Sequence, residues 1–110
     1  MALTRQRLLK AYKMWPNRQT RTLTQKRTDT DVTVTDTVRR PTKLQTLAFI
    51  GNIGLDNEVC DFLLPVDTLQ SAEPINGDFI TDTDGNIWTV VMVARELEQT
   101  IFRCTSSSQR

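Results

Sequence analysis

The residues that most often carry chemistry in proteins are scarce in this sequence. Histidine, the commonest general base and metal ligand, does not occur among its 110 residues. No serine or cysteine lies in a nucleophile motif, and no glycine-rich loop is present that would hold a phosphate. The two cysteines, Cys60 and Cys104, match no metal or redox spacing, and we interpret them as small buried hydrophobes in a reducing cytosol. The sequence therefore predicts a protein that is not an enzyme and holds no cofactor.

Three aspartates, Asp78, Asp82 and Asp84, lie close together and invite the hypothesis of a calcium loop. An EF-hand loop needs glycine at its sixth position and glutamate at its twelfth. Counting from Asp82, these positions hold Ile87 and Val93, so the pattern fails. We interpret the aspartates as turn and edge residues and predict no metal site.

Charge is unevenly divided along the chain, although the net formal charge is only +1. Residues 1–43 contain 11 Lys and Arg against 3 Asp, whereas residues 44–110 contain 3 Arg against 10 Asp and Glu. Such an imbalance is typical of a basic arm that meets nucleic acid or an acidic partner surface, and simple solvation of both halves is the alternative. The candidate interface consists of basic residues from the first half: Arg5, Arg7, Lys10, Arg18, Arg21, Lys26 and Arg27.

Residues 4–15 show the spacing of a short basic helix that ends at Pro16. Its apolar positions are Leu8, Ala11, Tyr12 and Trp15. We assign it to an N-terminal arm over residues 1–17. A helix this short is marginal alone, so we expect it to dock on its own domain or on a neighbouring subunit rather than on a membrane. Nothing near the N-terminus is typical of a signal peptide or a membrane span.

The clearest structural signal is a β-hairpin within residues 74–93. Asp84-Gly85 is a favoured pair for a two-residue type I′ turn, and the flanking runs are rich in β-branched and aromatic residues. With this turn, antiparallel pairing sets Thr81 against Trp88. The core face of the hairpin then carries Phe79, Trp88, Val90 and Met92. The opposite face carries Ile80, Ile87, Val91 and Val93.

Further segments also have the composition of strands. They are residues 18–27, 32–38, 43–50, 59–64 and 100–105, with one helical turn expected at residues 67–70. The first is basic and threonine-rich, and we interpret it as an edge strand because lysine and arginine deter unwanted pairing there. The pattern predicts a mainly β fold, a small β-barrel or sandwich over residues 18–105, with the short helix before it and a flexible polar tail over residues 106–110.

A resemblance to the small head-tail connector proteins of tailed bacteriophages is carried by two runs, Gly77-Asp78-Phe79-Ile80-Thr81-Asp82 and Asp84-Gly85-Asn86-Ile87-Trp88-Thr89-Val90. The earlier run Arg21-Thr22-Leu23-Thr24-Gln25 adds to it. In that family, which includes the head-closure (stopper) and joining proteins of the neck, a Gly-Asp entrance, an Asp-Gly turn and a Trp-x-Val strand belong to a compact β-barrel. The resemblance covers roughly the last third of the chain, and the basic helix at residues 4–15 departs from it.

The resemblance implies a structural protein of the virion neck, made in the host cytoplasm, whose copies form a hexameric or dodecameric ring around the DNA channel. Its expected partners are the portal or adaptor protein and the tail proteins, with DNA passing through the lumen without sequence-specific binding and with no membrane contact. A competing hypothesis is a small nucleic-acid-binding β-barrel that uses the basic half, with Trp88 and Phe102 stacking on bases. A tail-terminator or head-decoration protein is a third.

Overall fold

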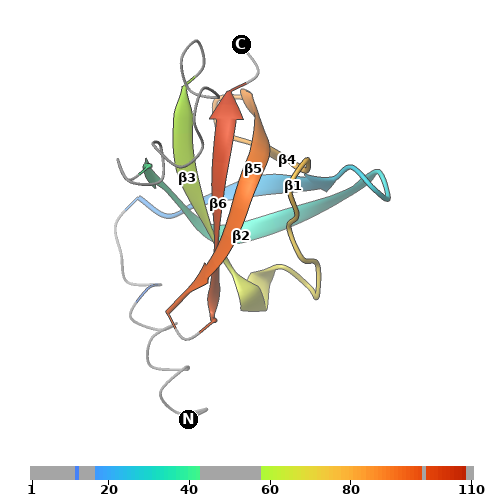
Figure 1. The fold of residues 1–110 in the computed structure, drawn as a ribbon. Coiled ribbons are helices and arrows are strands. Elements are labelled where there is room, and N and C mark those ends of the chain that lie inside the picture. The colour runs from blue at the N-terminus through green and yellow to red at the C-terminus, as the bar shows by residue number, and fades with distance from the viewer. Residues whose placement is uncertain (1–11, 13–16, 43–57, 98, 109–110) are drawn as a thin grey trace.

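The chain forms a closed, mainly β barrel in which all strand pairs are antiparallel (Figure 1). The computed structural model describes residues 12, 17–42, 58–97 and 99–108. Its elements are β1 (Gln19–Gln25), β2 (Thr30–Pro41), β3 (Val59–Pro65), the 3-10 turn η2 (Val66–Thr68), β4 (Phe79–Thr81), β5 (Ile87–Glu96) and β6 (Ile101–Ser108). Around the barrel the strand order is β1-β2-β3-β6-β5-β4. The predicted β-rich class is confirmed, and the architecture is the barrel rather than the sandwich.

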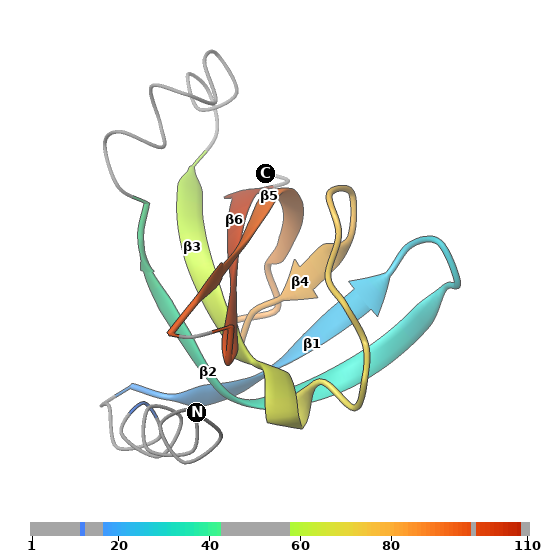
Figure 2. The same ribbon diagram turned by 60° about the horizontal axis from the view of Figure 1, so that its bottom comes forward.

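β2 is the longest strand, and it bends so that it pairs with two different strands, one after the other. Residues 30–37 pair with β1 and residues 38–41 pair with β3. The register of the β1–β2 pair shifts between Gln19 and Arg21, and Asp36 has a φ of 58°. An irregularity of this kind bends a strand and increases its twist. β2 can therefore leave β1 and continue along β3, as the curved ribbon in Figure 2 shows.

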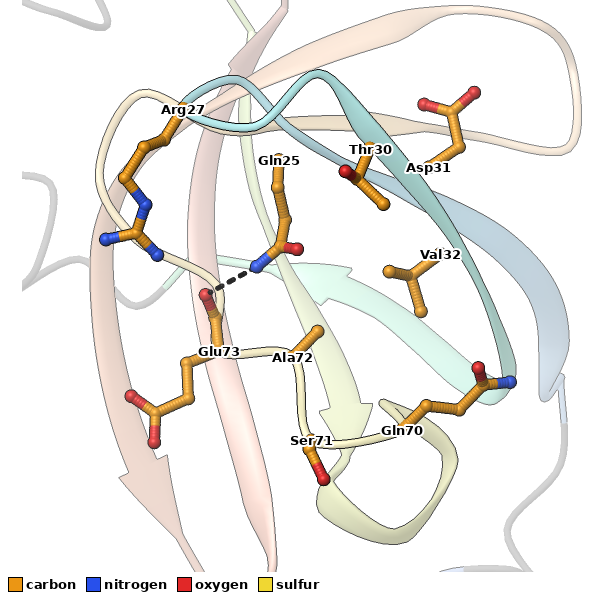
Figure 3. A pocket seen from close by; sticks show the side chains of 9 residues that line it. All are labelled: Gln25, Arg27, Thr30, Asp31, Val32, Gln70, Ser71, Ala72 and Glu73. Carbon is orange, nitrogen blue, oxygen red and sulfur yellow. Dashed lines mark hydrogen bonds between the residues drawn. The ribbon is translucent and has the colours of Figure 1, made fainter.

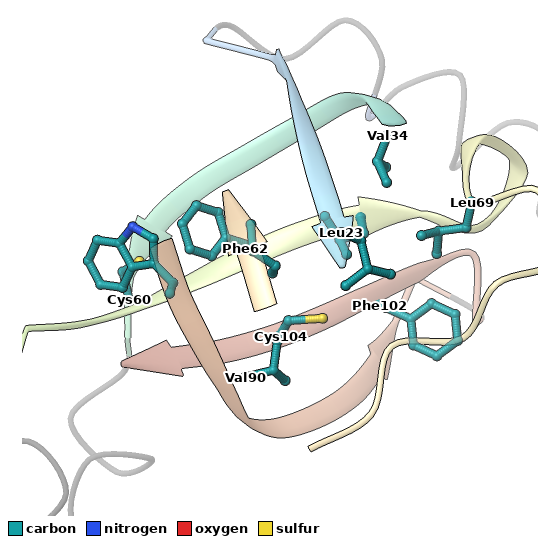
Figure 4. Close-up of a cluster of buried hydrophobic side chains, with 11 residues drawn as sticks. Leu23, Val34, Cys60, Phe62, Leu69, Val90, Phe102 and Cys104 are labelled. Carbon is teal, nitrogen blue, oxygen red and sulfur yellow. The ribbon is translucent and has the colours of Figure 1, made fainter. Parts of the chain in front are cut away.

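Inward-facing apolar side chains fill the barrel (Figure 4). The interior cluster consists of Leu23, Val34, Cys60, Phe62, Leu64, Leu69, Ile80, Trp88, Val90, Phe102 and Cys104. Phe62 and Trp88 meet edge to face with ring centroids 5.6 Å apart, an arrangement that adds about 0.5–1.5 kcal/mol to the effect of burial. Both cysteines are free thiols and buried, as the sequence indicated.

The predicted hairpin is present, but its register differs from the prediction by one residue. Ile80, not Thr81, lies opposite Trp88. Side chains alternate between the two faces of a strand, so this slip exchanges the faces of β4. Ile80 is fully buried in the core, and Phe79, which we placed on the core face, lies half-buried on the outer side.

The length of the hairpin loop explains the slip. The Gly85 N–H donates to the Asp82 carbonyl, and the Asp82 N–H donates to the Asn86 carbonyl. These bonds define a three-residue loop in which Gly85 has a φ of 86°, instead of the predicted two-residue turn. One added loop residue moves the pairing of the two strands by one position.

A second irregularity lies in β5, where the register against β6 shifts between Val90 and Met92. Beyond it Val93, opposite Cys104, packs against the interior cluster. Met92, which we predicted on the core face, is half-buried and lies outside that cluster. A bulge changes which residues face inward, and the sequence pattern alone does not mark it.

The prediction of a flexible tail from residue 106 is wrong, because β6 continues to Ser108. Ser106 lies opposite Cys60 of β3 on one side and opposite Val90 of β5 on the other. All three serines of residues 106–108 are buried. Polar residues become ordered here because neighbours on both sides satisfy their backbone groups.

Other predictions have mixed outcomes. The edge-strand interpretation of residues 18–27 is wrong, because β1 lies between β2 and β4. The expected helical turn is η2, which begins one residue early and is the only helical element among the described residues from 17 onward. The predicted strand over residues 43–50 and the predicted helix over residues 4–15, apart from Tyr12, lie outside the described residues.

Candidate functional site

A buried ion cluster joins β1, β2 and the hairpin loop. Arg21 Nε donates to Asp82 Oδ1 at 2.6 Å, and Arg39 Nη1 donates to Asp82 Oδ2 at 2.8 Å. The side chains of Arg21 and Asp82 are only 5% and 3% exposed. Arg21 Nη1 also donates to the Thr37 hydroxyl at 2.7 Å. Charges this deep in a protein are tolerated when they are paired and hydrogen-bonded, so the cluster ties three parts of the barrel together.

The same two arginines cover aromatic rings of the core. The Arg21 guanidinium lies 5.3 Å from the centre of the Phe62 ring, and that of Arg39 lies 4.6 Å from the Trp88 ring. Trp88 and Phe102 are 1% and 5% exposed. A ring that stacks on a nucleic-acid base has to be open to solvent. These two rings belong to the core instead.

Burial affects the ionisable groups of the interior in different directions. By itself it raises the pKa of Asp82, but the N–H of Thr83 and the guanidinium of Arg21 outweigh it, and the pKa lies below its ordinary value of 3.8. Burial raises the pKa of Cys60 to about 12 and also raises that of Cys104. Both thiols are therefore protonated at neutral pH and are poor nucleophiles.

The two other aspartates of the suspected calcium loop hold backbone amides. Asp78 is buried, and its carboxylate accepts the N–H groups of Ile75 at 2.9 Å and Lys26 at 3.2 Å. Asp84 accepts the N–H of Asn86 at 3.0 Å. In the described part of the chain no group of three or more His, Cys, Asp or Glu residues is placed to hold a metal ion. In those same residues no helix is long and apolar enough to cross a membrane.

Tyr12 fastens the N-terminal arm to its own barrel. It is 1% exposed and packs with Leu63 and Ile101 on the outer side of the β3–β6 pair. Its hydroxyl donates to the carbonyls of Leu63 and Asp36, and burial raises its pKa. The arm therefore contributes at least one side chain to a second apolar cluster outside the barrel wall.

The structure disperses the predicted interface residues. Arg18 is exposed and pairs with Asp36 at 3.1 Å, while Lys26 and Arg27 are exposed at the turn beyond the other end of β1, about 25 Å along the strand. Arg21 is buried in the ion cluster, so its assignment to an interface is wrong. Arg21 faces the interior because it lies two residues before the inward-facing Leu23, and residues two apart in a strand point to the same face. The remaining predicted positions lie outside the described residues: Arg5, Arg7 and Lys10.

A groove lies between the start of β2 and the loop that follows η2 (Figure 3). It measures about 550 Å³ and is lined by Gln25, Arg27, Thr30, Asp31, Val32, Gln70, Ser71, Ala72 and Glu73. Val32 and Ala72 pack against the interior cluster and give the groove an apolar part. The other lining residues carry polar groups suited to hydrogen bonding. The groove therefore combines an apolar patch with groups that can form hydrogen bonds.

Neither a family model nor a curated protein or solved structure matches the chain. Functional assignment therefore rests on the residues and their geometry. Sequence reasoning missed both the Asp82–Arg39 pair and the groove, because each joins segments far apart along the chain. One local signal could have revealed the ion cluster: Arg21 occupies a position that alternation with Leu23 places on the inner face of β1.

Proposed function

We propose that this protein is a non-enzymatic structural component of a bacteriophage neck, a head-closure or connector protein whose copies form a ring around the DNA channel. The observation that carries the proposal is that the residues of the family resemblance form β1, β4 and the first part of β5, which are neighbouring parts of the closed barrel. Gly77 enters β4 with a φ of 99°, and its N–H donates to the Val90 carbonyl. Asp82 and Gly85 form the loop, and Trp88 fills the core. The closed barrel agrees with the fold that the resemblance implies.

The packing of the barrel also favours a structural role. Side chains fill the interior of the barrel, so the barrel that the described residues form does not enclose a ligand cavity. Any contact with other molecules would therefore be made by the outer surface and the barrel ends. A ring requires each copy to present two different surfaces that meet head to tail.

The nucleic-acid alternative is weakened by the pairing of the described cations. Every described arginine except Arg27 forms an ion pair with an aspartate or glutamate of its own chain. Lys26, the described lysine, lies 5.8 Å from the ring of Phe79. An arginine that is already paired with a carboxylate gains less free energy on binding a phosphate, because the existing ion pair must first be broken. Only Lys26 and Arg27 remain as cations without a carboxylate partner in the described ranges.

Binding to random duplex DNA separates the two hypotheses. A nucleic-acid binder loses affinity by about 0.9 log units per log unit of salt for each phosphate neutralised. We expect weak or undetectable binding near physiological salt, measured by fluorescence anisotropy, and no change on Arg27→Glu. Binding tighter than about 1 µM that falls steeply with salt, and that Arg27→Glu weakens, would favour the nucleic-acid protein.

The composition of purified virus particles tests the neck assignment. Quantitative mass spectrometry is expected to find this chain in tail-bearing particles at the copy number of a hexamer or dodecamer relative to the portal protein. Particles that lack the chain, or that carry it in as many copies as the capsid protein, would rule out a neck ring.

A further inference from the structure

The first half of β2 leaves one of its edges without a strand partner among the described residues. Residues 30–37 pair with β1 on one side, whereas pairing with β3 on the other side begins only at Val38. The element beside that edge is η2, which contributes one side-chain bond, from the Thr68 hydroxyl to the Thr35 carbonyl at 3.1 Å. An open strand edge is a template for pairing with another extended chain.

Two observations indicate that Asp31 and Thr33 direct their backbone N–H and C=O groups to this open edge. The Thr35 carbonyl points there, and every second residue of a strand directs its backbone groups the same way. The Thr24 hydroxyl bonds the Asp31 carboxylate at 2.7 Å, and such close side-chain approach is typical of a pair that does not exchange backbone hydrogen bonds. The bonding groups of Asp31 and Thr33 are therefore available to a new strand.

The open edge forms one wall of the groove in Figure 3, and the loop over residues 70–73 forms the other. The bond from Gln25 to the Glu73 carbonyl at 3.4 Å spans the groove near one end, and the Thr68–Thr35 bond lies beyond the other. Between them the apolar side chains of Val32 and Ala72 are within reach of a ligand. Backbone bonds from a strand edge together with an apolar pocket are the two requirements of strand addition.

The chain itself supplies a segment suited to this groove. Residues 43–50 have the composition of a strand and carry the apolar side chains Leu44, Leu47, Ala48, Phe49 and Ile50. The barrel closes without them, because β2 pairs directly with β3. The end of β2 and the turn between β1 and β2 lie on opposite sides of the barrel (Figures 1 and 2).

The length of segment 43–57 indicates that the groove takes this segment from a second copy. Thr33 and Thr42 are nine strand residues apart, about 30 Å before the bend is taken into account. The segment 43–57 leaves and re-enters the barrel at one place, since Pro41 lies opposite Cys60. A segment tethered at both ends extends at most about 25 Å and would bring only its tip to its own groove. Pairing over several residues therefore calls for another molecule.

We propose that residues 44–50 of one copy add as a strand to the open edge of β2, at Asp31 and Thr33, in the next copy. The donor segment follows the last residues of β2 and the acceptor lies near its first residues, so the contact joins different surfaces of the two copies and propagates head to tail into a ring or an open chain. The inference deepens the proposed neck ring and rests on it for the closure of the assembly. It does not require that any other protein be present.

The test uses the full-length chain in sedimentation velocity at rising concentration. Wild type is expected to associate beyond its 12.6 kDa monomer. Thr33→Pro removes one N–H from the open edge and places a ring there, and it is expected to weaken association about tenfold or more. Thr33→Ala keeps that N–H and is the matched control, expected to associate as wild type does. Ala72→Glu alters the opposite wall and serves as the second variant if Thr33→Pro does not fold.

Mixing two defective variants distinguishes this contact from others. Phe49→Asp weakens the donor and Thr33→Pro weakens the acceptor, so each variant alone is expected to be monomeric at concentrations where wild type is largely associated. Their mixture retains one intact donor and one intact acceptor and is expected to give a one-to-one heterodimer. A wild type that stays monomeric at every concentration, a Thr33→Pro or Ala72→Glu variant that associates normally, or a mixture that stays monomeric would each overturn the proposal.

The outcomes separate this inference from the neck assignment. If the chain is present as a ring in virus particles but Thr33→Pro and Ala72→Glu leave association unchanged, strand addition fails and the neck role stands. If both variants and the mixture behave as expected but particles lack the chain, the neck role fails and the head-to-tail contact stands.

Discussion

Two strand segments of the barrel both carry hydroxyl side chains but differ in their surroundings. β6 ends in Thr105-Ser106-Ser107-Ser108 and β2 begins with Thr30-Asp31-Val32-Thr33. The end of β6 has hydrogen-bonded neighbours on both sides and is buried, whereas the start of β2 pairs with one strand only among the described residues and is largely exposed. We call these regions the closed wall and the open wall. Neighbouring strands, more than composition, therefore decide whether a polar strand is buried in the wall or keeps an open edge.

The largest expected effect is on the core that the closed wall encloses. Trp88→Ala removes a ring that is 1% exposed and in contact with Phe62, and is expected to lower the free energy of unfolding by about 3–5 kcal/mol. Trp88→Phe is the control and should cost clearly less, because the indole Nε1 makes no hydrogen bond. Urea unfolding measures both. Equal stability of wild type and Trp88→Ala would mean that the ring is not in the core.

Proline within the closed wall should be nearly as damaging. Ser107 lies between Val59 of β3 and Thr89 of β5. Ser107→Pro removes a ladder hydrogen bond from a central strand, and we expect a loss of about 3 kcal/mol or more. Thermal melts of this variant and of Ser107→Ala would show it. A proline variant as stable as the alanine variant would argue for a loose end, as the sequence alone suggested.

The ion cluster beside the core is expected to have a somewhat smaller effect. Asp82→Ala leaves the buried Arg21 without its carboxylate, and we expect a loss of about 2–3 kcal/mol. The value is below that of a fully buried pair because the second partner, Arg39, is 36% exposed. Asp84→Ala, in the same loop but exposed, should cost about 0.5–1 kcal/mol. Equal losses in chemical denaturation would contradict a special role for Asp82.

The same cluster predicts a pH dependence. The folded pKa of Asp82 lies below its ordinary value of 3.8, so ionised Asp82 contributes to stability above about pH 4, and this contribution is lost as the pH falls through the folded pKa. Unfolding free energies of wild type and Asp82→Asn, measured from about pH 7 down to about pH 2, should converge at the acidic end. A difference that stays constant over this range would contradict the assignment.

The smallest expected effect on stability is at the open wall. Thr33→Pro should lower the free energy of unfolding by less than about 1 kcal/mol, because the lost N–H has no strand partner. The comparison with Ser107→Pro isolates the neighbours as the variable, since the substituted residues are both small hydroxyl side chains. Similar losses in the two proline variants would show that the two walls do not differ as described.

Sequence patterns captured the parts of the fold that depend on local signals. The hairpin, the strands β1, β2, β3 and β6, and the turn η2 all follow from alternation and turn residues. The number and spacing of the strands predicted a small barrel or sandwich, and the structure decides for the barrel. The single-residue slip at Phe79 and Ile80 was not accessible, because Asp84-Gly85 suits both a two-residue and a three-residue loop.

The ion cluster, the end of β6 and the groove depend on contacts between residues far apart in the sequence. The sequence predicted Arg21 as a surface cation, but in the structure it is buried and paired with Asp82, 61 residues later in the chain. Ser106 to Ser108 looked like a tail until two strands were seen to flank them. The groove exists only because the loop after η2 lies beside β2. No local pattern encodes such pairings, so the candidate site needed the three-dimensional structure.

Electron cryomicroscopy of the neck in intact virus particles tests the central claim most directly. We predict a closed ring of these barrels between portal and tail, with neighbouring copies meeting head to tail around a channel that passes duplex DNA. Particles whose neck contains no such barrel, or that carry it as isolated single copies, would contradict the account.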